Sequence, residues 1–142
     1  AMKMTMHDYA KKSKFKEMIQ TMCNGEVNGS DMYYVYAYLA KEKGYDDVYE
    51  AIMANAAEDA FHGGRYGAML GKGKEQEEEF WKALIGFYKL EADAEPKLQK
   101  MADQAREAGE EALAREIEAS IEEENEHARR LAKVFEAHGI KY

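Results

Sequence analysis

Apolar side chains recur every three or four residues along most of the chain, which is the spacing of residues on one face of an α-helix. Glycines such as Gly44 and Gly109, together with the single proline, Pro96, interrupt this pattern. The pattern predicts four long helices over residues 12–43, 46–71, 75–108 and 110–138. We expect a kink or local irregularity near Pro96, because proline lacks the backbone donor and clashes with the carbonyl four residues earlier.

The connections between these helices are short, which favours antiparallel packing of helices that are neighbours in sequence. Helices do not alternate with strands along the chain, as they would in an α/β fold. A chain of 142 residues is long enough to bury one core. The expected fold class is therefore all-α, an antiparallel four-helix bundle that forms a single domain over residues 1–142.

Each apolar face turns polar near the centre of its helix. The first and third helices carry one glutamate at this point, and the second and fourth carry an acidic residue three positions before a histidine. Residues three apart lie on the same helix face and can point at one ion. The six residues concerned are Glu26, Asp59, His62, Glu91, Glu124 and His127.

A fixed offset of 65 residues relates the two halves of the chain without any gap, as in the pair His62 and His127. The same offset joins the remaining acidic positions and many other matching residues, among them Glu26 and Glu91, Gly44 and Gly109, Ile52 and Ile117, and Arg65 and Arg130. We interpret it as a duplicated helical hairpin. Each half supplies one carboxylate from its first helix and an acid-x-x-His pair from its second.

An isolated glutamate on an apolar face is usually a boundary residue, and a single acid-x-x-His pair often arises by chance. The six residues together are far more specific, because one two-fold rule relates them all. Four carboxylates buried together would repel one another and lose solvation, so a cation is their expected partner. Oxygen-rich ligands with two imidazoles suit iron or manganese, and zinc can substitute.

The composition narrows the partners and the compartment. The chain has 20 Lys and Arg against 28 Asp and Glu, a net charge of −8, which argues against binding to nucleic acid. Its one cysteine, Cys23, excludes an internal disulfide and a paired Cys-x-x-Cys metal site. Because neither a long apolar window nor a secretory leader is recognisable, we expect no membrane insertion and a cytoplasmic location.

The charge of the six-residue set indicates redox chemistry. Four carboxylates neutralise two divalent ions, whereas two ferric ions need further negative ligands derived from oxygen. A site that is neutral when reduced and completed by oxygen ligands when oxidised suits the two-electron reduction of hydrogen peroxide or dioxygen.

The arrangement resembles that of ferritin-like di-metal carboxylate proteins, and in particular the chain is similar to the rubrerythrin family. The similarity lies in Gly25-Glu26, Tyr33, Lys41-Glu42-Lys43-Gly44-Tyr45, Arg106-Glu107-Ala108-Gly109 and Glu124-Asn125-Glu126-His127-Ala128. The resemblance implies a ferritin-like bundle with two iron ions, for which manganese or zinc can substitute. It also implies a peroxidase that reduces hydrogen peroxide in oxidative-stress defence, a homodimer with helix exchange, and a hydrogen bond from Tyr33 near the site.

Three features depart from the family pattern. Asp59 stands where the family has glutamate, which should change the metal spacing. Ala94 stands where the family has a second glutamate one turn beyond Glu91, and the neighbouring Glu95 is a candidate replacement. The rubredoxin domain of full-length members is missing, so we expect the electrons to come from a separate donor such as rubredoxin.

Two other functions fit the same residues. One is a ferritin-like ferroxidase or iron-handling protein, in which iron is the substrate, and it would turn over many Fe(II) ions per site. The other is a structural bundle with a relic metal site, for which Glu124→Ala would change neither metal content nor stability.

Overall fold

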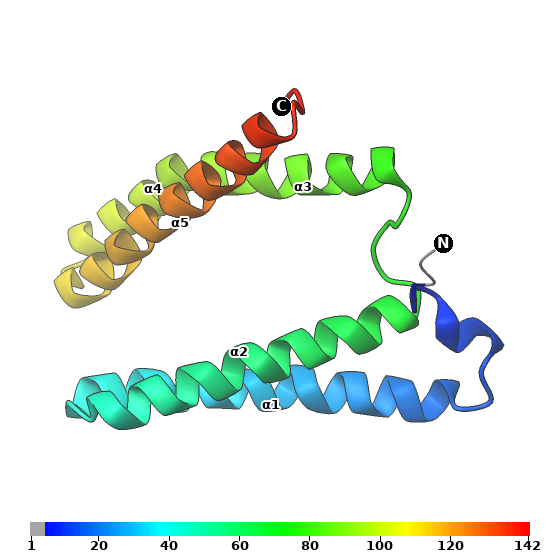
Figure 1. Cartoon of the computed structure of the whole chain (residues 1–142). Coiled ribbons are helices and arrows are strands. Elements are labelled where there is room, and N and C mark those ends of the chain that lie inside the picture. Colours follow the sequence, from blue (N-terminus) through cyan, green and yellow to red (C-terminus); the bar gives the residue numbers. More distant parts are fainter. Residues whose placement is uncertain (1–4) are drawn as a thin grey trace. The chain divides into compact units, whose positions relative to one another are not determined.

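The computed structural model describes residues 5–142, and every regular element in that range is a helix (Figure 1). The predicted all-α class is therefore confirmed for the described residues. The elements are a short 3-10 helix and five α-helices: η1 (Tyr9–Lys12), α1 (Lys16–Lys43), α2 (Asp46–Met69), α3 (Glu77–Ala92), α4 (Ala94–Glu107) and α5 (Glu111–Ala137). They form two compact units divided after Gly73, which we name the first hairpin (η1, α1 and α2) and the second hairpin (α3, α4 and α5).

In the first hairpin, α1 and α2 lie side by side and antiparallel along most of their length (Figure 1). Gly44 ends α1 with a φ of 77°, a left-handed conformation that glycine adopts without strain. Small residues occupy much of the buried seam between the helices, among them Ala37, Ala40 and Ala56. Their size lets the two backbones approach closely.

The segment before α1 is attached to the end of α2. The backbone amide of Asp8 donates a 2.8 Å hydrogen bond to the carbonyl of Ala68, and Nε2 of His7 lies 3.1 Å from the carbonyl oxygen of Lys72. The first predicted helix therefore begins at Lys16 rather than near residue 12, with η1 as a separate element before it.

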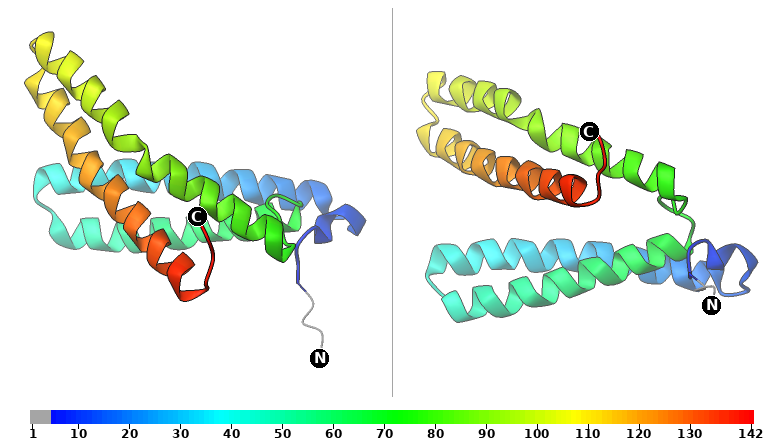
Figure 2. Two further views of the ribbon diagram at one scale, coloured as in Figure 1. Left: turned by 90° about the horizontal axis from the view of Figure 1, so that it is seen from above. Right: turned by 45° about the horizontal axis from the view of Figure 1, so that its top comes forward.

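In the second hairpin, α5 runs antiparallel beside both α3 and α4, as the two views of Figure 2 show. A cluster of alanines, including Ala102 and Ala114, forms the core between α4 and α5. Between α3 and α5 the core is instead aromatic, because Phe135 is completely buried and packs against Trp81 and Tyr88.

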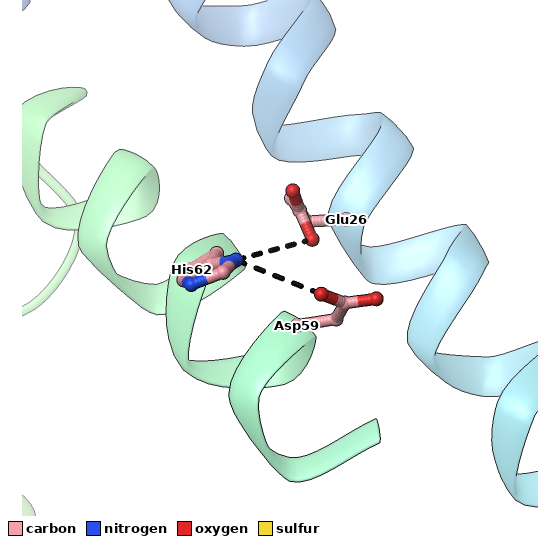
Figure 3. A group of neighbouring side chains, drawn as sticks. All are labelled: Glu26, Asp59 and His62. Atoms are coloured by element: carbon pink, nitrogen blue, oxygen red, sulfur yellow. Dashed lines mark ion pairs between the residues drawn. The ribbon is translucent and has the colours of Figure 1, made fainter. Parts of the chain in front are cut away.

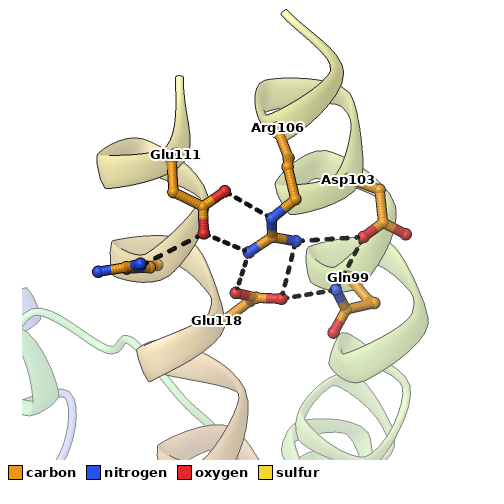
Figure 4. Close-up of polar contacts among 6 residues, drawn as sticks. Gln99, Asp103, Arg106, Glu111 and Glu118 are labelled. Atoms are coloured by element: carbon orange, nitrogen blue, oxygen red, sulfur yellow. Dashed lines mark hydrogen bonds and ion pairs between the residues drawn. The ribbon is translucent and has the colours of Figure 1, made fainter. Parts of the chain in front are cut away.

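The turn that joins α4 to α5 is surrounded by a network of charged side chains (Figure 4). Arg106 donates hydrogen bonds of 2.7 Å to Glu111 and to Glu118, and Gln99 donates a third bond of 2.9 Å to Glu118. These hydrogen bonds from Arg106 lower the pKa of both glutamates. The network therefore connects the two arms of the second hairpin near its turn.

The irregularity expected near Pro96 is present, and it divides the predicted helix over residues 75–108 into two. α3 ends at Ala92, α4 begins at Ala94, and Asp93 between them has φ −93° and ψ 0°. Pro96 lies in the first turn of α4, where it has no amide hydrogen to offer the carbonyl of Ala92. The interruption follows Glu91 by two residues.

None of the helices in residues 5–142 combines the length and the apolar character that crossing a lipid bilayer requires.

Candidate metal centre

The first hairpin brings three of the expected ligands together, which we name the first trio: Glu26, Asp59 and His62. Glu26 points from α1 toward Asp59 and His62, which lie one turn apart on α2 (Figure 3). Nδ1 of His62 is 3.7 Å from Oε2 of Glu26 and 3.6 Å from Oδ1 of Asp59. Between 29% and 40% of each side chain is exposed. The trio is therefore partly open within its own hairpin.

The second hairpin brings the other three together in the same manner, and we name them the second trio: Glu91, Glu124 and His127. Glu91 lies near the end of α3, and the acid-x-x-His pair lies on α5. Nδ1 of His127 is 3.1 Å from Oε2 of Glu91, within hydrogen-bonding distance. In each trio the candidate ligand atoms all lie within 4.8 Å of one another.

The two carboxyl groups of the second trio lie close together, since their candidate ligand atoms are within 4.8 Å of each other. Their interaction lowers the pKa of Glu91 and raises the pKa of Glu124. Two carboxyl groups at this distance compete for one proton. A metal cation can take the place of that proton and neutralise both groups, so the donor set fits a bound cation.

The histidines present the same atom in both trios. Nδ1 of His62 and Nδ1 of His127 face the carboxylates. Nδ1 is therefore the candidate ligand atom, and Nε2 is left to form a hydrogen bond with an outer partner. Neutral imidazole nitrogen and carboxylate oxygen together suit iron and manganese.

The first trio lies where the two helices approach closely. A Cβ atom at Gly63 would be 3.3 Å from Cγ2 of Val27 and 3.6 Å from Cβ of Glu26. The buried thiol of Cys23 lies one turn before Glu26, with Sγ 3.6 Å from the carbonyl oxygen of Gly63. The missing side chain at Gly63 therefore lets α2 bring its ligands close to Glu26.

Two further residues singled out in the sequence lie outside the trios. Glu95 is an exposed residue in the first turn of α4, after the interruption, and belongs to neither group of candidate ligands. Tyr33 is half-buried, and no hydrogen bond joins its hydroxyl to a trio in the described part of the chain. Its proposed hydrogen bond stays a prediction.

Tyr33 instead lines an open, mainly apolar hollow of about 510 Å³ on the first hairpin. The other lining residues are Gly29, Met32, Tyr36 and Ile52. The position of this hollow could not be predicted, because it depends on how Ile52 of α2 meets α1.

No protein-family model, curated protein or solved structure gives a significant match to the chain. Its function is therefore inferred from the two trios and their surroundings.

Proposed function

We propose that the chain is a non-haem di-iron oxidoreductase similar to rubrerythrins, which reduces hydrogen peroxide with electrons from a separate donor. One observation carries the proposal. Two trios of carboxylate, carboxylate and imidazole recur at a constant offset of 65 residues, and each is gathered by its own hairpin. A chance cluster of acidic residues would not reproduce both the ligand types and the helical positions.

The proposal includes a ferritin-like four-helix bundle in which the two trios face each other. Its support is that large apolar side chains stay exposed on both hairpins. The exposed fraction is 49% for Phe15 and 41% for Val48 on the first hairpin, and 56% for Phe87 and 53% for Met101 on the second. Burial of such side chains is favourable by about 1.5–3 kcal/mol each. We therefore expect the exposed apolar side chains of each hairpin to be buried against those of another hairpin. That hairpin belongs either to the same chain or to the second subunit of a homodimer.

The chemistry follows from the donor set. Two iron ions held by the trios would supply two electrons, which with two protons convert hydrogen peroxide to two molecules of water. The four carboxylates would balance the charge of two divalent ions, and His62 and His127 would each offer one imidazole nitrogen as a ligand. A proton on Glu124, whose pKa is raised by the neighbouring Glu91, would have to leave before a cation binds, so metal affinity should fall as the pH is lowered.

Metal binding by matched variants tests the proposal. Glu124 belongs to the second trio, and the adjacent Glu123 is an exposed residue of the same charge. Anaerobic titration with Fe(II) should give two ions per wild-type chain and per Glu123→Ala chain, and weaker binding by Glu124→Ala. Removal of the metal should also lower the melting temperature of the wild type, because the carboxylates lose their counter-charge.

The oxidation reaction tests the substrate. Reduced, iron-loaded protein should be oxidised faster by stoichiometric hydrogen peroxide than by dioxygen.

Two outcomes would contradict the proposal. Equal iron binding by Glu123→Ala and Glu124→Ala would contradict the metal site. Accumulation of many iron ions per chain would instead show a ferroxidase.

A further inference from the structure

The second hairpin contains a cluster of neighbouring aromatic rings, three of which belong to the oxidisable residues Trp81, Tyr88 and Tyr142. Tyr142, which follows α5, lies with its ring centre 4.9 Å from that of Tyr88 on α3 and 5.2 Å from that of Phe135 on α5. The ring centre of Trp81 on α3 lies 6.3 Å from that of Phe135. The cluster holds the single tryptophan of the chain and the only two tyrosines after residue 73.

Both ends of this cluster have a proton acceptor. Nε1 of Trp81 donates a 2.9 Å hydrogen bond to Oε1 of Glu77, and the hydroxyl of Tyr142 donates a 3.0 Å hydrogen bond to Oε1 of Glu136. Indole and phenol lose a proton readily when they lose an electron. A carboxylate already in hydrogen-bonding contact can accept that proton without any rearrangement.

The cluster also connects a candidate metal ligand to solvent. Tyr88 lies three residues before Glu91 on α3, so both project from one helix face. Tyr142 is 47% exposed, whereas Phe135 between the rings is completely buried. The hydrogen bond to Glu136 raises the pKa of Tyr142.

We propose that Tyr88 and Tyr142, with Trp81 joined through Phe135, form a one-electron relay. The relay carries single electrons from a donor at the protein surface to an oxidised side chain inside the second hairpin. Tyr142 gives one electron to the oxidised Tyr88 or Trp81 and its phenolic proton to Glu136. A soluble one-electron donor of the thiolate or ascorbate class then reduces the Tyr142 radical, and Glu136 returns the proton. The relay itself needs no metal. Its starting point rests on the proposed function: a single ferrous ion held by the second trio would supply only one of the two electrons that hydrogen peroxide takes up, and the aromatic cluster would supply the other.

The single tryptophan makes the relay testable in the metal-free, full-length chain. Azidyl radicals produced by pulse radiolysis oxidise tryptophan selectively, and the tryptophan and tyrosyl radicals have distinct absorption bands. In the wild type, the Trp81 radical should decay in a first-order step that is independent of protein concentration, while a tyrosyl radical appears at the same rate.

Variants that keep the ring packing identify the acceptor. The double variant Tyr88→Phe/Tyr142→Phe should lose the first-order step, whereas Tyr34→Phe, which removes an exposed tyrosine of the first hairpin, should retain it. Glu136→Gln should slow the step, because the proton of Tyr142 loses its acceptor. Transfer that persists in the double variant, or that is absent from the wild type, would overturn the relay.

The connection to the second trio is tested separately. After peroxide is added to the iron-loaded protein, a nitroso spin trap should label Tyr142, as located by mass spectrometry of peptides. If the metal-free chain shows transfer but the loaded chain shows no label in the second hairpin, the relay stands and its starting point is wrong. The two outcomes therefore distinguish the relay from the proposed function.

Discussion

The two hairpins follow one plan with unequal geometry at their candidate ligands. His127 lies 3.1 Å from Glu91, whereas the equivalent His62 lies 3.7 Å from Glu26. The acidic residue three positions before the histidine also differs by one methylene group, since it is Asp59 in the first trio and Glu124 in the second. A constant offset in sequence therefore preserves the type of ligand but not the contacts among the ligands.

The packing around the trios differs more than the trios themselves. One turn before the glutamate, the first hairpin has the buried Cys23, and the second has Tyr88 within the aromatic cluster. One residue after the histidine, the first has Gly63 and the second Ala128. The first hairpin thus places its ligands by close backbone approach, and the second by large side chains between its helices.

The largest expected effect follows from this difference in packing. Phe135→Ala should lower the free energy of unfolding of the second hairpin by about 3–5 kcal/mol, because Phe135 is completely buried among aromatic rings. Denaturant titration measures the loss, and hydrogen exchange shows which helices lose protection.

The matched control is Leu70→Ala, at the equivalent position of the first hairpin, where the side chain is only half-buried. It should cost less. Equal loss of protection in both hairpins after Phe135→Ala would contradict their separate cores.

A smaller effect is expected from exchanging the third ligand. Asp59→Glu should give the first trio the reach of the second and tighten binding of Mn²⁺ by about tenfold, or about 1.4 kcal/mol. Isothermal titration calorimetry measures the two dissociation constants. The reverse change, Glu124→Asp, should weaken Mn²⁺ binding at the second trio. An unchanged affinity in both variants would show that the length of this side chain does not set the Mn²⁺ affinity of a trio.

The smallest effect concerns the charged network around the second turn. The pKa values of Glu111 and Glu118 are lowered in the folded hairpin from 4.5. Their ionised forms therefore favour folding at pH well above 4.5, and this contribution is lost as the pH falls through the lowered folded pKa values. Arg106→Gln should lower the melting temperature by only a few degrees near neutral pH, because the charged groups are exposed. It should have no effect in acid, because both glutamates are then protonated.

Lys41 is the equivalent of Arg106 in the first hairpin, where its ammonium lies 4.7 Å from the centre of the Tyr49 ring. Lys41→Gln should show no comparable pH dependence. A pH-independent effect of Arg106→Gln would mean that the methylene groups of Arg106, rather than its charge, stabilise the turn.

Local features of the fold could be predicted from the sequence because they depend on residues close together along the chain. Glycine with positive φ follows the first arm of each hairpin, at Gly44 and Gly109, and the interruption near Pro96 has a cause within one turn. The trios could be predicted because a two-fold repeat constrains both at once.

Features that depend on the meeting of distant segments could not be predicted. Tyr142 packs on Tyr88 across 54 residues only because the segment after α5 turns back toward α3, and helical periodicity does not extend to that segment. The contact of Arg106 with Glu118 depends on the register of the turn between α4 and α5. Glu95 is a different case, because it follows Glu91 by only four residues, but the interruption at Asp93 places the two glutamates on different helices.

The interruption at Asp93 has a mechanical consequence for the two candidate ligands on the first arms. α1 is one continuous helix of 28 residues, and Glu26 lies within its unbroken series of backbone hydrogen bonds. On the second hairpin the helix is interrupted at Asp93, two residues after Glu91, and Pro96 has no amide hydrogen to donate to the carbonyl of Ala92. We therefore expect the chain to bend more easily between Glu91 and α4 than anywhere within α1, so that Glu26 lies on the stiffer of the two supports.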